Sequence, residues 1–180
     1  MKRKSNGRKP AARKAEVAKK VQPMPSGYHN VTPYLSVAGA ADAIEFYKKA
    51  LGAKEIMRMP GPDGKLGHVE IQIGDSRVML SDEYKDMAFV GPKSLGGTSV
   101  HLHVYVKDAD AQFEKALAAG GTVVEPLEYK FYGDRSGCIE DPFGHRWHLS
   151  THVRDVPPAE MKKKAAEFAK GQAPGQQAVS

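Results

Sequence analysis

The chain contains 180 residues, of which 41% are apolar and 27% charged, and its formal net charge is +6. This length suits one domain with a single core and is too short for two well-buried domains of ordinary size. No segment approaches the roughly 18 apolar residues that span a bilayer, and the amino terminus lacks the apolar stretch of a secretory signal. We therefore expect a soluble, cytoplasmic protein with no membrane contact.

The basic charge is concentrated in residues 1–26, which hold nine Lys and Arg residues against a single acidic residue, Glu16. This tail carries a net charge of +8, so the rest of the chain, by difference from +6, carries −2. A segment so poor in aromatic and β-branched residues is expected to be disordered. It could make weak electrostatic contact with nucleic acid, whereas it lacks the spaced Leu and Phe of an organelle presequence.

The next part of the chain predicts one helix and four strands in the order βαβββ. The strand VTPYLSV (31–37) precedes an amphipathic helix, AADAIEFYKKALG (40–52), which ends at a glycine. Three strands joined by Gly-Pro-Asp-Gly and Gly-Asp turns follow: KEIMRM (54–59), LGHVEIQIG (66–74) and SRVMLSD (76–82).

The same order recurs in the second half of the chain. Its elements are VHLHVYV (100–106), the helix DADAQFEKALAAGG (108–121), TVVEPLEYK (122–130), GDRSGCIE (133–140) and HRWHLST (145–151). Both helices contain Lys-Ala-Leu followed closely by glycine. Such a repeat indicates a duplicated module that cannot close its own sheet and buries a shared core by pairing.

These patterns divide the chain into one domain between two tails. The divisions are a basic tail at 1–26, a domain at 27–155 with modules at about 28–90 and 97–155, and a carboxyl-terminal tail at 156–180 that contains a short surface helix, 158–170.

Alternation along the strands separates apolar from polar side chains. The apolar faces should pack on the two helices, and the polar faces should converge on a concave, pocket-like side. The residues expected together on that side are Tyr34, Met79, His101, His103, Tyr105, Arg146 and His148, with His68, Glu70 and Gln72 as neighbours. Three other histidines, His29, His145 and His152, lie at strand ends or in turns and are expected to be solvated.

Two histidines of that polar side, His101 and His148, come from opposite ends of the second module. With a carboxylate such as Glu70, neutral imidazoles could hold Zn, Fe, Mn or Ni. The alternative, and the more common role of a histidine on a strand, is a hydrogen-bonded pocket or surface group. Cys138, the only cysteine, excludes an internal disulfide and a cysteine-based zinc site, and we interpret it as a small buried residue.

Several phrases of the sequence resemble one family. They are the first-strand Pro-Tyr-Leu, AIEFYKKALGA, GHVEIQIGDSRVMLSDE and FYGDRSGCIEDPFGHRWHLSTH, within residues 28–154. Together with the duplicated module they resemble the vicinal oxygen chelate superfamily, which is the glyoxalase, bleomycin-resistance and extradiol-dioxygenase group, and in particular its PhnB-like branch. The resemblance implies an α+β fold in which two βαβββ modules form a cup-shaped mixed sheet, and it implies a homodimer.

In catalytic members of that superfamily, four ligands hold a divalent metal in the cup. The resemblance places Thr32, Met79, His101 and His148 at those four positions. Only the two histidines suit a metal, so the standard four-ligand site is expected to be absent. Resistance proteins of the same superfamily bind an antibiotic in the cup without a metal.

The sequence therefore supports two main hypotheses for the cup. In the first, it binds a small, partly aromatic or polar molecule without the standard metal site. The residues predicted to contact that molecule are Tyr34, Met79, His103, Tyr105, Tyr132, Arg135 and Arg146. In the second, a metal at His101 and His148 serves a lyase, isomerase or dioxygenase, and Glu70 is the catalytic carboxylate. Nucleic-acid contact through the basic tail is an accessory hypothesis.

Overall fold

A computed structural model describes residues 21–171 of the chain. The predicted basic tail lies outside the described residues except for 21–26, so the hypothesis of nucleic-acid contact concerns mainly a part that the structure does not describe. Within residues 21–171, no helix is long and apolar enough to cross a bilayer.

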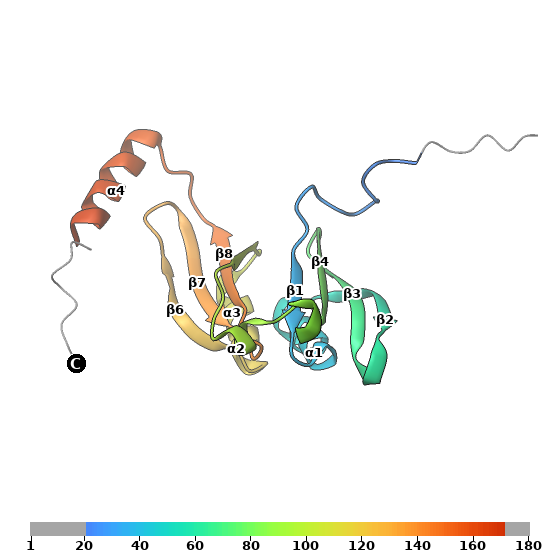
Figure 1. Ribbon diagram of the computed structural model, residues 1–180. Helices are drawn as coiled ribbons and strands as arrows, with labels where there is room; N and C mark the ends of the chain where they lie inside the picture. The colour runs from blue at the N-terminus through green and yellow to red at the C-terminus, as the bar shows by residue number, and fades with distance from the viewer. Residues whose placement is uncertain (1–20, 172–180) are drawn as a thin grey trace, which may run out of the picture.

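The first module contains five elements in the predicted order: β1 (Tyr34–Val37), α1 (Ala40–Leu51), β2 (Lys54–Pro60), β3 (Leu66–Ile73) and β4 (Ser76–Asp82). Its strands form one sheet in the order β1-β4-β3-β2, with β1 parallel to β4 and the other pairs antiparallel (Figure 1). Asp82 Oδ1 accepts hydrogen bonds from Gly39 N and Ala40 N at 3.0 and 2.9 Å. The end of β4 therefore caps the start of α1, satisfying two amide groups that the helix itself leaves free.

The second module repeats this order: β5 (His101–Tyr105), α3 (Ala109–Ala118), β6 (Thr122–Tyr129), β7 (Asp134–Glu140) and β8 (Arg146–His152). Its sheet has the strand order β5-β8-β7-β6, with β5 parallel to β8. A short helix, α2 (Pro92–Leu95), lies in the connection between the modules. The prediction of an α+β fold built from two βαβββ modules is confirmed, with the strands arranged as two four-stranded sheets.

One hydrophobic core joins the two modules. α1 packs against α3, and buried residues from both sheets belong to the same cluster. Tyr47 of α1 and Trp147 of β8 meet there with their ring centroids 5.3 Å apart. Both side chains donate hydrogen bonds to Asp141 Oδ2, each at 2.9 Å. Because Tyr47 belongs to the first module and Asp141 to the second, this buried network fixes how the modules sit against each other.

Asp141 also shapes the turn predicted between β7 and β8. Its Oδ1 accepts hydrogen bonds from Phe143 N and His145 N, both at 2.9 Å, and Gly144 adopts a φ of 91°. His145 is buried, and its Nε2 lies 3.2 Å from Ser36 O of the first module. The prediction that His145 is solvated is wrong, because the turn directs the ring into the contact between modules.

The described chain ends with α4 (Pro158–Gly171), at the place of the expected surface helix. Figure 1 shows this helix standing apart from both sheets. None of its residues is buried. Its contacts include the ring of Phe168 against that of Phe131, with centroids 5.3 Å apart, and an ion pair of 2.7 Å between Glu160 and Arg154.

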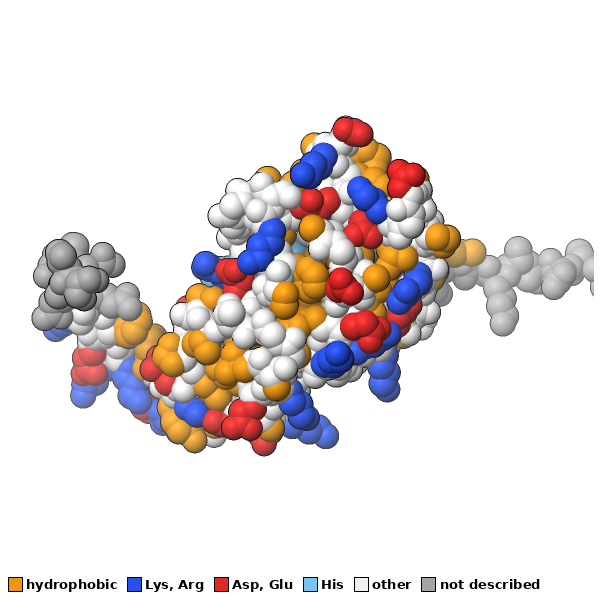
Figure 2. Space-filling model, turned by 90° about the horizontal axis from the view of Figure 1, so that it is seen from below, with side chains coloured by type: hydrophobic (Ala, Val, Ile, Leu, Met, Phe, Trp, Pro, Cys, Tyr) orange, Lys and Arg blue, Asp and Glu red, His pale blue; other side chains and the backbone are white. Residues whose placement is uncertain are grey.

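The face of the folded part shown in Figure 2 carries charges of both signs. On that face, the side chains of Lys and Arg are interspersed with those of Asp and Glu. This distribution agrees with the small net charge that the sequence assigns to the chain beyond its basic tail.

Candidate functional site

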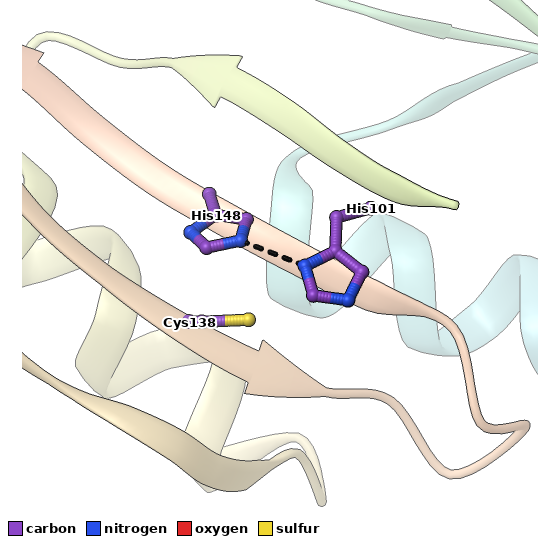
Figure 3. Close-up of side chains that lie close together, drawn as sticks. All are labelled: His101, Cys138 and His148. Atoms are coloured by element: carbon purple, nitrogen blue, oxygen red, sulfur yellow. Dashed lines mark hydrogen bonds between the residues drawn. The ribbon is translucent and has the colours of Figure 1, made fainter. Parts of the chain in front are cut away.

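The polar face of the second sheet brings three histidines and the cysteine together. Strand register places His103 beside His148 and His148 beside Cys138, so these side chains form a row across β5, β8 and β7. The rings of His103 and His148 are stacked, with centroids 5.6 Å apart and planes inclined by 8°. His101 Nδ1 and His148 Nε2 are hydrogen-bonded at 3.0 Å (Figure 3). We call the surface formed by His101, His103, Cys138 and His148 the histidine face.

Cys138 is the buried member of this face. Its side chain has no exposed surface, as the sequence predicted, and its Sγ lies within 4.8 Å of a ring nitrogen of both His101 and His148. Burial raises the pKa of the Cys138 thiol to about 11 and lowers the pKa of the His148 imidazole. Near neutral pH, the face therefore presents a neutral thiol beside a neutral imidazole. This grouping was not predicted from the sequence, because a lone cysteine was weighed only against zinc sites made of several cysteines.

A buried carboxylate, Asp134, lies at the other end of the same sheet. Its Oδ2 accepts a hydrogen bond from Tyr105 OH at 3.0 Å, and its Oδ1 lies 2.7 Å from His152 Nδ1. Tyr105 and His152 each form a hydrogen bond with Asp134, and in both residues this bond is the main cause of a raised pKa. Glu70 was the only carboxylate predicted for the cup, and Asp134 was not predicted. Because side chains alternate along a strand, Asp134 and Cys138 lie on the same face of β7, and this pattern could have predicted the position of Asp134.

The first sheet carries a separate polar cluster. Tyr34 OH is hydrogen-bonded to His68 Nδ1 at 2.9 Å, and His68 Nε2 lies 3.4 Å from Glu70 Oε1. A hydrogen bond from Tyr28 is the main cause that lowers the pKa of Glu70. Met79 pairs in register with both Tyr34 and Glu70. Glu70 is thus an ionised hydrogen-bond acceptor, which makes it a weak proton acceptor at neutral pH.

Within residues 21–171, no hydrogen bond or ring contact joins this cluster to the histidine face, and the two sheets share no ladder. The residues expected together on one concave side therefore form two clusters, one on each sheet. β1 and β5 each form one edge of their own sheet, and cavities lie between these two strands. One of about 750 Å³ is lined by Tyr34, Leu102 and His145, among others. A second, of about 940 Å³, is lined by Pro33, Arg77, Leu102, His103, Tyr105 and Gln112, among others.

The remaining predicted contact residues lie at different places. Arg146 is beside His101 in register and forms an ion pair with Glu140 at 3.5 Å. Tyr132 is partly exposed in the turn between β6 and β7. Arg135 points to the helix side of the sheet, where its guanidinium pairs with Asp110 of α3 at 2.6 Å. This ion pair separates Arg135 from the histidine face.

The comparisons with known proteins decide the family. A model of the Glyoxalase/Bleomycin resistance protein/Dioxygenase superfamily matches residues 28–149. The chain belongs to this superfamily. It is also 50% identical to the Mycobacterium tuberculosis protein Rv0887c over 129 residues, which cover 70% of this chain and 76% of that protein. The resemblance of the sequence to the vicinal oxygen chelate group is therefore confirmed.

Solved structures of the superfamily share the fold. The PhnB protein from Bacillus cereus has 19% sequence identity and a TM-score of 0.55, with 68% of this chain and 99% of that chain covered. TnmS3, an antibiotic binding protein from Streptomyces sp. CB03234, has 18% identity and the same TM-score, with 74% and 100% covered. These likenesses show that the fold predicted from the sequence is shared with both proteins.

Proposed function

We propose that this protein binds a small, partly aromatic and polar molecule between its two modules, without the standard four-ligand metal site of the superfamily. The observation that carries the proposal is the cavity of about 940 Å³ beside β5. This volume falls at the upper end of the range of about 300–1,000 Å³ that is typical of small-molecule sites. The antibiotic-binding description of TnmS3 gives a precedent for binding on the same fold.

The lining of this cavity suits a ligand with a flat apolar body and a few polar groups. Leu102, Val104 and Trp147 supply apolar surface, while His103 and Tyr105 offer aromatic rings with hydrogen-bonding groups. The side chains at the family's other ligand positions support the absence of the standard site, since neither Thr32 nor Met79 is a usual donor to a divalent metal.

A thermal-shift screen of aromatic and antibiotic-like compounds tests the proposal. A ligand present at about 100 times its Kd should stabilise the folded protein by about 2.7 kcal/mol and raise Tm by several degrees. The Tyr105→Ala variant should lose most of that shift, whereas Tyr129→Ala, on an exposed tyrosine of β6, should retain it. A screen in which no compound changes Tm would contradict the proposal.

The alternative function is a metal-dependent lyase, isomerase or dioxygenase. The hydrogen bond of 3.0 Å between His101 and His148 favours it, because both rings already lie where they could share one cation. Such a metal would polarise a substrate oxygen as a Lewis acid. Glu70 belongs to the other polar cluster, so Glu125, which pairs in register with Cys138 and acts electrostatically on His148, is the better placed carboxylate for moving a proton. Assays of the metal-loaded protein for these three reactions would distinguish the alternative.

We also propose that the chain acts as a homodimer, as its family resemblance implies. Tyr105 and Tyr34, two of the predicted ligand contacts, are 64% and 44% exposed in the single chain. A second chain packed over them would shield a bound ligand from water. Light scattering coupled to size-exclusion chromatography should give twice the chain mass. A mass near 19.6 kDa, that of one chain, would contradict the dimer.

A further inference from the structure

We propose that His101, Cys138 and His148 form a three-donor site for a thiophilic divalent cation, with Zn²⁺ as the preferred ion. The thiol belongs to β7 and does not occupy any of the four ligand positions that the family resemblance assigns. The inference goes beyond the proposed binding of an organic molecule and does not depend on it.

The separation of the two ring nitrogens is already close to that between two ligands of a tetrahedral metal. The two ring nitrogens and the sulfur lie within 4.8 Å of one another, and His101 Nδ1 and His148 Nε2 are 3.0 Å apart. Around zinc, bond lengths of about 2.0 Å to nitrogen and 2.3 Å to sulfur imply N···N and N···S separations of about 3.3 and 3.5 Å at tetrahedral angles. The imidazoles would therefore separate by only a few tenths of an ångström.

The scaffold holds the three donors on neighbouring strands. β8 is paired with β5 on one side and with β7 on the other, and Cys138 stands opposite His148 in the antiparallel register. Figure 3 shows the sulfur directed toward the pair of imidazoles. A hydrogen bond between His101 and His148 alone would not require a thiol there. The hydrogen bond that the Cys138 thiol donates to Ile139 O is long at 3.8 Å.

The donor chemistry selects the class of metal. Two imidazoles and one thiolate suit Zn²⁺, whereas Mn²⁺ and Mg²⁺ prefer the carboxylate and carbonyl oxygens that this donor set lacks. On binding, the cation replaces the proton of the thiol, which is released to solvent. Three protein donors leave a fourth position for water or a ligand, and the exposure of His101 opens that position to solvent.

Cobalt substitution tests the site directly. The full-length protein, freed of metal by a chelator under reducing conditions, is titrated with Co²⁺ and followed by absorption. One equivalent should produce visible ligand-field bands of a tetrahedral site together with a near-ultraviolet band for charge transfer from thiolate to cobalt. Because the chain contains one cysteine, that charge-transfer band in the unaltered protein reports on Cys138 without any variant.

Variants then assign the three donors. Cys138→Ser should lose the charge-transfer band, and both Cys138→Ser and His148→Gln should weaken Zn²⁺ binding, measured against a competing chelator, by more than about 10-fold, the lower limit seen for removing outer-shell partners. His152→Gln, on the exposed end of β8, is the matched control and should retain the band and the affinity. Circular dichroism checks that each variant is folded.

Two results would overturn the inference. The first is an unaltered protein that takes up no Co²⁺ or Zn²⁺. The second is uptake of cobalt without the charge-transfer band, which would mean that imidazoles bind the metal without Cys138. Either result leaves the thermal-shift screen with organic compounds unaffected, so a failure of the metal site and a failure of the proposed function can be told apart.

Discussion

Asp141 gathers four hydrogen bonds on one buried carboxylate, and we expect it to dominate stability among single residues. Asp141→Ala would leave the buried Tyr47 hydroxyl and Trp147 indole N–H without partners, at about 1–3 kcal/mol for each stranded group. We predict a loss of at least about 3 kcal/mol in the free energy of unfolding, measured by urea denaturation.

Two other variants should lose less stability than Asp141→Ala. Tyr47→Phe removes one donor and leaves Asp141 its other partners, so it should cost only about 1–1.5 kcal/mol. Asp86→Ala, at an exposed carboxylate, should change stability by less than about 0.5 kcal/mol. If Asp141→Ala proves no more harmful than Tyr47→Phe, the carboxylate does not organise the contact between modules.

His152 should give stability a pH dependence. Its hydrogen bonds to Asp134, at 2.7 Å, and then to Asp155, at 3.0 Å, raise its pKa above the usual value of about 6.5. Folding thus favours the protonated ring, so the stabilisation is fully present below about pH 6.5 and is lost as the pH rises through the raised folded-state pKa. Tm measured across this window should fall less steeply in His152→Gln than in the unaltered protein.

The pH dependence of Tm has to be compared between His152→Gln and the unaltered protein, because another histidine changes stability with pH in the opposite direction. Burial lowers the pKa of His148, so that ring contributes stability that is gained as the pH rises toward about 6.5. Identical pH profiles for the His152→Gln variant and the unaltered protein would show that the pair with Asp134 is not formed in solution.

At the scale of the element, the turn between β6 and β7 depends on a close backbone approach. Gly133 has a φ of 102°, and a Cβ atom there would lie 2.0 Å from Arg154 O. Its own carbonyl accepts hydrogen bonds from Val153 N and Arg154 N, both at 3.0 Å. This turn therefore fixes the segment that follows β8 against the start of β7.

Gly133→Ala should therefore destabilise the protein by about 3 kcal/mol or more, because the methyl group clashes with backbone and the backbone conformation is itself strained. Gly74→Ala provides the control, since Gly74 also has a positive φ, 60°, but no atom within 4 Å of the added methyl group. It should cost about 1–2 kcal/mol, the cost of a left-handed backbone conformation for a residue that has a Cβ atom. Equal unfolding midpoints of the two variants in urea would contradict the close approach.

The strands and their faces could be predicted from the sequence because the signals are local. Alternation along β5 correctly separated Leu102 and Val104 from the exposed His101 and His103. The pairing of Cys138 with His148 was also within reach, since the two lie on either side of the same turn at nearly equal distances. It was missed because Cys138 was judged alone and not by its neighbour across the hairpin.

The arrangement of the two polar faces could not be predicted in the same way. It depends on how α1 packs against α3 and on the buried bonds from Tyr47 to Asp141, which join residues far apart in the chain. The burial of His145 has the same origin, since its partner Ser36 belongs to the other module. A strand pattern determines which side chains share a face but not which faces meet.

At the scale of the whole molecule, α4 should be dispensable for folding. None of its residues is buried, and its contacts with the rest of the described chain are at the surface. Deletion of residues 158–180 should change the free energy of unfolding by less than about 1 kcal/mol, the scale of exposed ion pairs and single ring contacts. A truncated protein that aggregates or unfolds at a much lower urea concentration would show that α4 protects a surface that folding requires.

The bonds from Tyr47 and Trp147 to a single carboxylate oxygen also bear on how this duplicated protein can be divided. Tyr47 belongs to the first module, and Asp141 and Trp147 belong to the second. The first module alone would therefore leave the Tyr47 hydroxyl without its acceptor, and the second alone would leave Asp141 without one of its donors. Two polypeptides cut within residues 91–99, which connect the modules, should therefore be insoluble when made singly and should reassemble when produced together. The internal repeat would then behave as an obligate heterodimer whose two subunits happen to be encoded in one chain.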